Sequence, residues 1–166
     1  LELGATGTVT HIDGDRVSAF GPPMYNLGPT QFPMTRAYVY TLLPSLFSSS
    51  KLSATGDVIG TFLQDRATAI AGRLGPGPAL IPVTMTFDTA RAGRRTFKFG
   101  VVRDQLFTPL MTYASLLNTL GSYGRQFGTT TYAVQGKVSL RKYDAISFSN
   151  LFAGDGSSAN AAAFIV

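Results

Sequence analysis

The side chains that could do chemistry in this chain are few and scattered. His11 is the only histidine, and it stands two residues before Asp13 in the run Asp13-Gly14-Asp15. A histidine beside a carboxylate could act as a general base, but a turn signal begins between them, so we expect an exposed strand-end histidine. The same carboxylates could suggest calcium; the residues that follow offer almost no acidic ligands, which favours a hairpin turn. A histidine-based metal site would need further imidazoles that the sequence lacks.

Other short motifs also fall short of a site. The segment 72–78 lacks the Gly-Lys-Ser/Thr ending of a phosphate loop, and its prolines remove N–H donors. Asp15-Arg16 and Asp65-Arg66 recur at matching places, which favours structural ion pairs at strand ends over catalytic carboxylates. Ser48-Ser49-Ser50-Lys51 could suggest a serine activated by lysine, but a solvated turn is favoured. The sequence therefore predicts no catalytic residue, no cofactor and no metal.

The charge pattern argues against a nucleic-acid partner. The net charge is +5, and the only dense basic cluster is Arg91, Arg94 and Arg95 between two β-like runs. Three charges rarely hold a polyanion at physiological salt, so we expect a solvated hairpin tip. Alternating aromatics could stack on bases, although basic residues do not interleave with them, which favours a core or sheet-surface role. They are Phe97, Phe99, Tyr38 and Tyr40. A nucleic-acid-binding barrel would instead bind heparin in a salt-sensitive way.

Composition predicts a mostly β fold. The 166 residues include 18 Gly and 9 Pro, no Cys, 45% hydrophobic residues and only 14% charged residues. Such a chain favours short strands and turns over helices, and it has no disulfide framework or thiolate chemistry. No apolar run reaches membrane-spanning length. The start at Leu1 and the apolar end 161–166 suggest a piece of a longer protein.

The first half of the chain contains two similar hairpins. Strand, turn and strand over 5–20 are echoed over 52–72 at an offset close to fifty residues, with Ala19-Phe20-Gly21 matched by Ile70-Ala71-Gly72. This echo predicts a pseudo-symmetric small β-barrel in which each hairpin covers the other's edge. Between the hairpins, Pro29 and Pro33 predict loops, and 37–43 predicts a strand end or edge before Pro44.

The second half predicts paired strands at 80–87 and 96–102 and one helix. Thr108-Pro109 suggests an N-cap and first helical residue, and Gly121 an end, which gives a helix near 108–120. A further hairpin is expected at 129–134 and 137–141, with Gly136 at its turn. We thus expect a single barrel-like domain over 1–153. Residues 154–166 would form a flexible exit and the start of a truncated helix.

Several runs in the first half resemble one protein family, and together they form a specific pattern. The segments 5–10, 13–17 and 19–21 resemble the start of the peptidase domain of the stage IV sporulation protein B family, closest to its non-sporulation bacterial relatives. The similarity covers about residues 3 to 153, and the shared runs are Phe32-Pro33-Met34-Thr35-Arg36-Ala37, Leu43-Pro44-Ser45-Leu46, Ala54-Thr55-Gly56-Asp57-Val58-Ile59-Gly60-Thr61, Gln64-Asp65-Arg66-Ala67 and Ile81-Pro82-Val83. The resemblance implies a β-barrel related to chymotrypsin-like serine peptidases.

The sequence departs from the family at its catalytic positions. The resemblance implies a general-base His after Gly21, where this chain has Pro22, which can neither accept nor orient a proton. The family's Gly-rich nucleophile motif is absent; Gly154-Asp155-Gly156-Ser157-Ser158 is closest in composition but lacks the Pro. Pro22 therefore marks a degenerate family site.

The sequence predicts a non-catalytic structural or protein-binding domain derived from a serine-peptidase-like fold. Uncovered strands could pair with another protein chain or with a second copy. Because the related proteins are often found there, we expect a bacterial cell-envelope or secreted location. The alternative is a serine peptidase domain whose remaining catalytic residues lie outside this chain.

Overall fold

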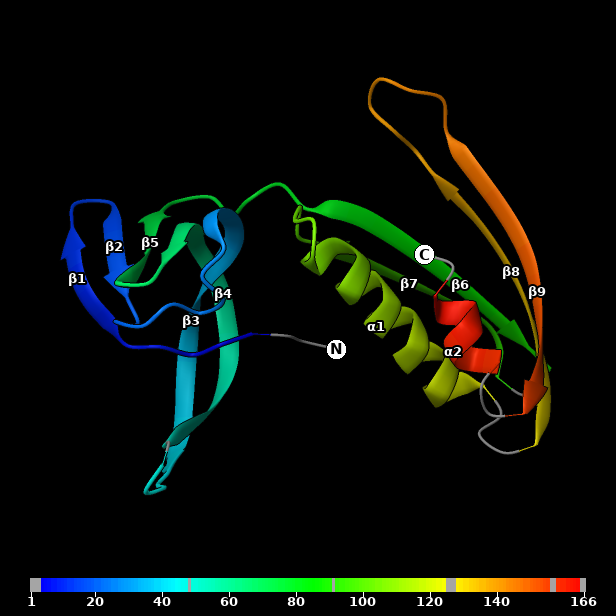
Figure 1. Cartoon of the computed structure of the whole chain (residues 1–166), viewed down its shortest axis with the longest axis horizontal. Helices are drawn as coiled ribbons and strands as arrows, with labels where there is room; N and C mark the ends of the chain where they lie inside the picture. The colour runs from blue at the N-terminus through cyan, green and yellow to red at the C-terminus, as the bar shows by residue number, and fades with distance from the viewer. Residues whose placement is uncertain (1–3, 48, 91, 125–127, 156–157, 165–166) are drawn as a thin grey trace. The chain divides into compact units, whose positions relative to one another are not determined.

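The computed structural model describes residues 4–47, 49–90, 92–124, 128–155 and 158–164, and it is mostly β, as predicted. The chain divides into two compact units where the sequence suggested one domain over 1–153. The N-terminal unit comprises Glu2–Ile81 with Val102–Asp104, and the C-terminal unit comprises Pro82–Val101 with Gln105–Val166. Each is described by itself (Figure 1).

The N-terminal unit is one antiparallel sheet in the order β1-β2-β5-β4-β3. Its buried core includes Val17, Ala19, Phe32, Met34 and Ile70, because alternate residues of a strand face the same side of the sheet. The strands are β1 (Val9–Asp13), β2 (Arg16–Ala19), β3 (Gly28–Leu43), β4 (Ser50–Arg66) and β5 (Ala69–Leu74).

The prolines of β3 correct one prediction. The stretch with Pro29 and Pro33 was expected to be loop, but both lie inside β3, paired with Gln64 and Thr61 of β4. A proline cannot donate a hydrogen bond, so strands tolerate it at a sheet edge. Strand β3 is such an edge, and it ends at Leu43 before Pro44, as expected.

The two echoed segments meet each other around a local pseudo-twofold axis. Ala19 and Ile70, which are equivalent in the echo, are direct partners between β2 and β5. At the other end, the Thr6 hydroxyl lies 2.7 Å from the Ser53 hydroxyl, and Gly4 lies beside the Thr55 methyl group. In the echo Leu3-Gly4-Ala5-Thr6-Gly7 matches Leu52-Ser53-Ala54-Thr55-Gly56, so the Thr6–Ser53 and Gly4–Thr55 contacts are equivalent to each other. The repeat in the sequence is therefore also present in the contacts.

The predicted barrel is not closed by strand pairing. The sheet order is linear, and within the described residues no ladder joins β1 to β3. The segment before β1 contacts the start of β4 through the Thr6–Ser53 hydrogen bond and a 2.7 Å hydrogen bond from Lys51 Nζ to Thr8 Oγ1. These side-chain contacts connect part of the sheet where no strand pairing closes it. The coarse prediction of a β-rich fold is confirmed, and an open sheet stands where a closed barrel was expected.

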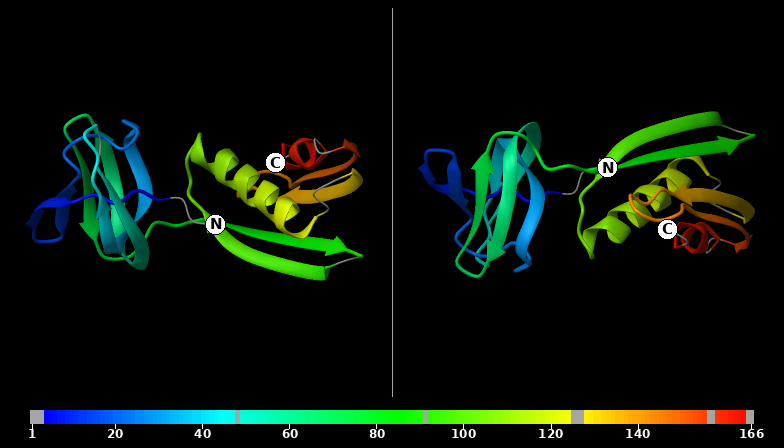
Figure 2. Two further views of the ribbon diagram at one scale, coloured as in Figure 1. Left: turned by 90° about the horizontal axis from the view of Figure 1, so that it is seen from below. Right: turned by 90° about the horizontal axis from the view of Figure 1, so that it is seen from above.

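Over its described residues, the C-terminal unit has two hairpins and two helices, with α1 lying between the hairpins (Figure 2). A buried cluster of Phe87, Leu120, Ala162 and Ala163 joins them. The elements are β6 (Ile81–Thr89), β7 (Gly93–Val101), α1 (Phe107–Tyr123), β8 (Thr129–Val138), β9 (Ile146–Asp155) and α2 (Ser158–Ala163).

Helix boundaries differ from those predicted. Helix α1 begins before Thr108, has Leu106 at its N-cap without a side-chain cap bond, and runs through Gly121. The segment 154–166, expected to be a flexible exit followed by the start of a helix, supplies the end of β9 and helix α2, whose Ala162 and Ala163 are completely buried. The small side chains of Ala162 and Ala163 allow α2 to pack closely beside Leu120 and Phe87. This packing explains why a segment with several polar residues forms a helix.

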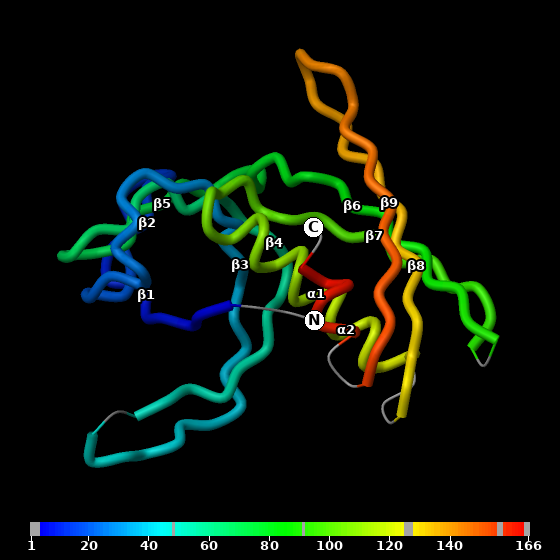
Figure 3. The backbone as a smooth tube through the Cα atoms, turned by 45° about the vertical axis from the view of Figure 1, so that its right-hand side comes forward, coloured from blue at the N-terminus to red at the C-terminus, as the bar shows by residue number. Residues whose placement is uncertain are grey.

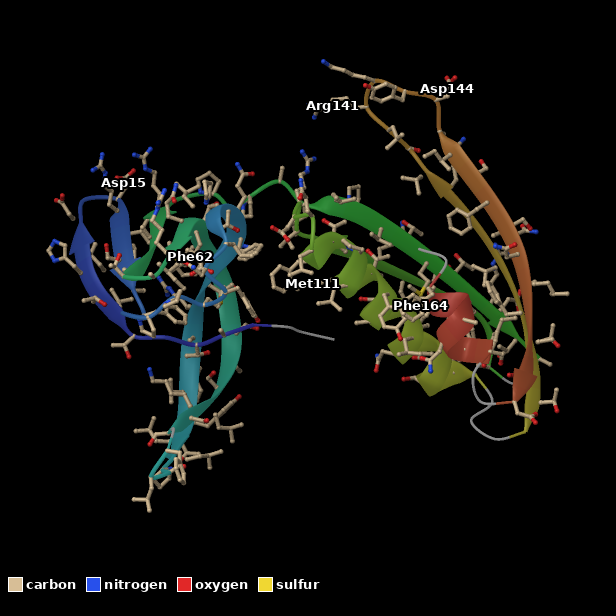
Figure 4. The ribbon with its side chains drawn as sticks, viewed as in Figure 1. Asp15, Phe62, Met111, Arg141, Asp144 and Phe164 are labelled. Carbon is tan, nitrogen blue, oxygen red and sulfur yellow. The ribbon has the colours of Figure 1, made fainter. Side chains whose placement is uncertain are left out.

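Gly136 was placed at a turn by its residue type, and this was wrong. It lies within β8, opposite Phe148 of β9, and the hairpin turns farther on, near Arg141 and Asp144 (Figure 4). A Cβ atom at Gly136 would overlap the Phe148 ring. The glycine therefore provides space for a cross-strand aromatic ring, a pairing known from designed sheets.

Two glycines of the C-terminal unit give a prediction with opposite signs. Gly136→Ala should lower the free energy of unfolding by about 1–3 kcal/mol, because the Phe148 ring must move. Gly121→Ala should raise it by about 0.5–1 kcal/mol, because Gly121 is helical with open space around it. Urea unfolding of both variants against the parent chain measures this. Changes of the same sign would contradict the structure.

Candidate functional site

The segment that carries Pro22 connects β2 to β3 and has an unusual backbone. Phe20 and Asn26 have positive φ angles of 77° and 57°, and Gly21 and Gly28 have 76° and 75°. Non-glycine residues rarely adopt such angles, so surrounding contacts must hold them there. The Phe20 ring provides one such contact, because it fills the space beside Gly7 and packs edge-on against Phe62. Phe62 is labelled in Figure 4.

Asp65 at the end of β4 provides the second contact. Its side chain is fully buried, and its carboxylate accepts hydrogen bonds from the backbone N–H groups of Met24 at 2.8 Å, Tyr25 at 2.7 Å and Leu27 at 3.4 Å. Charge-assisted bonds of this kind are about twice as strong as neutral ones. From the sequence, Asp65 was expected to form an ion pair with Arg66. Its three partners are instead backbone N–H groups, and the types of the residues that carry them give no sign of this role in the sequence.

The chemistry available at this site is structural. The 20–28 segment contains no His, Lys, Arg, Asp or Glu, and Pro22 is exposed within it. The carboxylate of Asp65, which contacts the segment, uses its oxygens on backbone N–H groups. Nothing in the segment can take a proton from a serine hydroxyl at neutral pH, so the geometry fixes a loop and supplies no general base.

The ion pairs differ from the predicted ones. Asp15 pairs with Arg73 of the neighbouring strand β5, with 3.0 Å between Asp15 Oδ2 and Arg73 Nε. Arg66 donates from Nε to Gln64 Oε1 at 3.0 Å. Asp15 lies in the β1–β2 turn next to Arg16, which is the register partner of Arg73, so its carboxylate lies near Arg73. Asp65 and Arg66 are consecutive residues of β4 and point to opposite faces of the sheet. Both members of the Asp15–Arg73 pair are more than half exposed, so it contributes little stability.

His11 has a serine neighbour that sequence reasoning missed. It is exposed on β1, as expected, and the strand register places it opposite Ser18 of β2. Asp13 belongs to the same strand and shares the face of His11, contrary to the expectation that a turn separates them. No hydrogen bond joins His11 to Ser18 among the described contacts. Ser18 is therefore the serine that the register places beside the histidine.

The remaining sequence candidates are occupied elsewhere. Ser48 lies outside the described residues, and Lys51 donates to Thr8 rather than to a serine. In the run 154–158, Gly156 and Ser157 also lie outside them, while buried Ser158 pairs with Thr130 at 2.7 Å. Within the part of the chain that the structure describes, no group of acidic or histidine side chains could hold a metal ion.

The basic and aromatic candidates belong to different units of the chain. Arg94 and Arg95 are exposed beside the tip of the β6–β7 hairpin, where a solvated turn was expected; Arg91 lies outside the described residues. Phe97 packs against Tyr123 of α1, with 5.4 Å between ring centroids, and so faces its own core. Tyr38 and Tyr40 contact each other on exposed β3. None of the described helices is long and apolar enough to cross a membrane.

The contacts of Asp65 predict a large effect of a small change. Asp65→Asn keeps the shape of the side chain but places an amide NH2 among N–H donors, so we expect a loss of about 2–4 kcal/mol in the free energy of unfolding. Amide exchange at Met24, Tyr25 and Leu27 should accelerate. Asp57→Asn, at an exposed aspartate of the same strand, is the control and should change stability by less than about 0.5 kcal/mol. Equal stability of the two variants would contradict this role of Asp65.

Comparison with known proteins adds no identification. No protein-family model, no curated protein and no solved structure matches the chain. What the chain does must therefore be argued from its own geometry: a loop fixed by a buried carboxylate, without a general base, on an open antiparallel sheet.

Proposed function

We propose that the chain is a non-catalytic structural or protein-binding domain whose N-terminal unit derives from a serine-peptidase-like β-barrel. The observation that carries the proposal is the Pro22 loop. It occupies the place where the resembling family has its general-base His, and Asp65 and Phe20 hold it in one conformation. A peptidase without its base loses several orders of magnitude in rate, so a fixed loop with proline there fits a scaffold.

The local pseudo-twofold axis supports the proposed relation to barrel peptidases. Equivalent segments of the two hairpins pair at Ala19–Ile70 and meet again at Thr6–Ser53. Duplicated hairpins that cover each other's edges are the arrangement expected of such a barrel. On this proposal the chain is related to the peptidase domain of stage IV sporulation protein B, and it works in the bacterial cell envelope or outside the cell.

A long exposed arm supports the binding role. The arm, defined as residues 37–53 at the ends of β3 and β4, extends away from the rest of the sheet (Figure 3). Its large apolar side chains are at least 42% exposed, and an exposed apolar patch of this kind is typical of an interaction site. They are Tyr38, Val39, Tyr40, Leu42, Leu43, Leu46, Phe47 and Leu52.

The proposal predicts that no serine is activated. We expect no adduct when the purified chain is treated with a fluorophosphonate and analysed by intact and peptide mass spectrometry, with an active serine peptidase labelled alongside. The Pro22→His variant should also remain unlabelled, because on this proposal no serine is positioned for the new histidine to activate. A stoichiometric adduct on one serine, Ser18 included, would overturn the non-catalytic assignment, and Ser18→Ala would identify that site.

A further inference from the structure

The outer edge of the arm is not suited to strand pairing. Within the described residues β3 pairs with β4 only, so it lies at the edge of the sheet. Its register with β4 shifts between Thr35 and Ala37 and again between Val39 and Thr41. Irregularities of this kind are among the features by which natural edge strands avoid pairing with other chains. We therefore expect a partner of the arm to contact its side chains rather than to continue the sheet.

Apolar side chains are exposed on both faces of the arm. Leu42 and Leu43 are consecutive residues of β3, so they point to opposite faces of the sheet, and they are 61% and 54% exposed. Residues 37–50 include no charged side chain, so no charge in this stretch would have to leave water if the arm were covered. A protein docked on the hairpin covers one face, whereas a lipid phase covers both faces at once. This arrangement favours lipid.

The tip of the arm, defined by Ser45, Leu46, Phe47 and Ser49, combines bare apolar side chains with internal hydrogen bonds. Leu46 and Phe47 have 103% and 101% relative exposure. The N–H group of Ser45 donates to Ser49 Oγ at 3.3 Å, and the N–H group of Phe47 donates to Ser45 Oγ at 3.2 Å. Backbone groups without a partner are costly in lipid. These bonds therefore lower the cost of moving the tip out of water.

The arm also carries the side chains that suit a layer of lipid headgroups. Lys51 is its only charged residue, and the strand register places it opposite Leu42. An ammonium group has several N–H donors, so the bond from Lys51 to Thr8 leaves others for phosphate. Tyr38 and Tyr40 lie farther from the tip, with 5.0 Å between their ring centroids, and are 67% and 64% exposed. Tyrosines are enriched at membrane–water interfaces.

We infer that the tip of the arm inserts into the surface of an anionic lipid bilayer. Leu46 and Phe47 then lie below the headgroups, and Lys51 contacts phosphate. Tyr38 and Tyr40 lie at the boundary with water. Insertion is shallow, to the depth of about 5–10 Å that interfacial amphipathic segments reach. This inference specifies a partner for the arm and so rests on the proposed binding role.

Vesicle flotation tests the inference. The parent chain should float with phosphatidylcholine–phosphatidylglycerol vesicles and less with phosphatidylcholine alone, because anionic headgroups attract basic residues. Leu46→Ser with Phe47→Ser should lower the partition coefficient for the anionic vesicles at least about tenfold, because two fully exposed apolar side chains no longer leave water. Since both positions are exposed, urea unfolding should show that this variant is as stable as the parent chain.

The matched control removes exposed apolar side chains from a hairpin of the C-terminal unit. Leu140 and Tyr143 lie between β8 and β9 and are 41% and 79% exposed. Leu140→Ser with Tyr143→Ser should change the partition coefficient by less than about twofold. If this variant loses as much binding as the tip variant, exposed apolar surface in general is responsible, and the inference is wrong. Equal flotation with both vesicle types would overturn the preference for anionic lipid.

A single tryptophan tests insertion directly, because the chain has none of its own. The emission of Phe47→Trp should shift to shorter wavelength when anionic vesicles are added, and lipids brominated on their acyl chains should quench it. Leu140→Trp should show neither change. An unchanged emission spectrum of Phe47→Trp in the presence of these vesicles would overturn insertion of the tip.

A protein partner is the competing occupant of the arm. If the chain does not float and sediments as a dimer that Leu46→Ser with Phe47→Ser dissociates, a second copy covers the tip and the inference is wrong. A monomer that does not float overturns it too. None of these results bears on the serine labelling that tests the proposed function, so failure of the inference and failure of the non-catalytic assignment are distinguishable.

Discussion

The N-terminal unit depends on the buried carboxylate of Asp65. An ionised carboxylate out of water is costly unless hydrogen bonds replace its hydration, and here backbone N–H groups of Met24, Tyr25 and Leu27 do so. Those donors can converge only because the backbone reverses at Phe20, Gly21, Asn26 and Gly28. The end of β4 and the connection from β2 to β3 therefore stabilise each other, and the connection fixes where the edge strand begins.

This constraint explains why the loop is suited to structure rather than catalysis. A general base must reach its substrate and change protonation state, whereas this loop presents exposed Pro22 on a backbone whose donors face inward. The carboxylate of Asp65 accepts hydrogen bonds from those donors. The surface of the unit that is suited to binding another molecule lies instead at the opposite end of β3 and β4, where the large side chains of the arm are exposed and apolar.

The local pattern of residue types predicted the positions of strands and helices well, and it predicted poorly which residues they contact. Alternation and turn residues located the first hairpin, the pair around the Arg-rich tip and the main helix, because those signals act within a few residues. Pro29, Pro33 and Gly136 were misread, since the residue type suggests a loop or turn while the role depends on a neighbouring strand. Asp65 shows the same limit: its side chain is acidic in any context, and only the fold brings three N–H groups to it.

The repeat in the sequence was more informative than any single motif. Equivalent residues Ala19 and Ile70 are direct partners, so the duplicated hairpins organise the sheet around a local axis. That axis relates β1 with β2 to β4 with β5, and β3 has no equivalent in it. As the unmatched strand, β3 lies at the edge. Its first half carries two prolines and an arginine, and in its second half the register with β4 shifts between Val39 and Thr41. A pseudo-symmetric pair of hairpins with one extra strand therefore leaves that strand at the edge of the sheet, where prolines and register irregularities are tolerated.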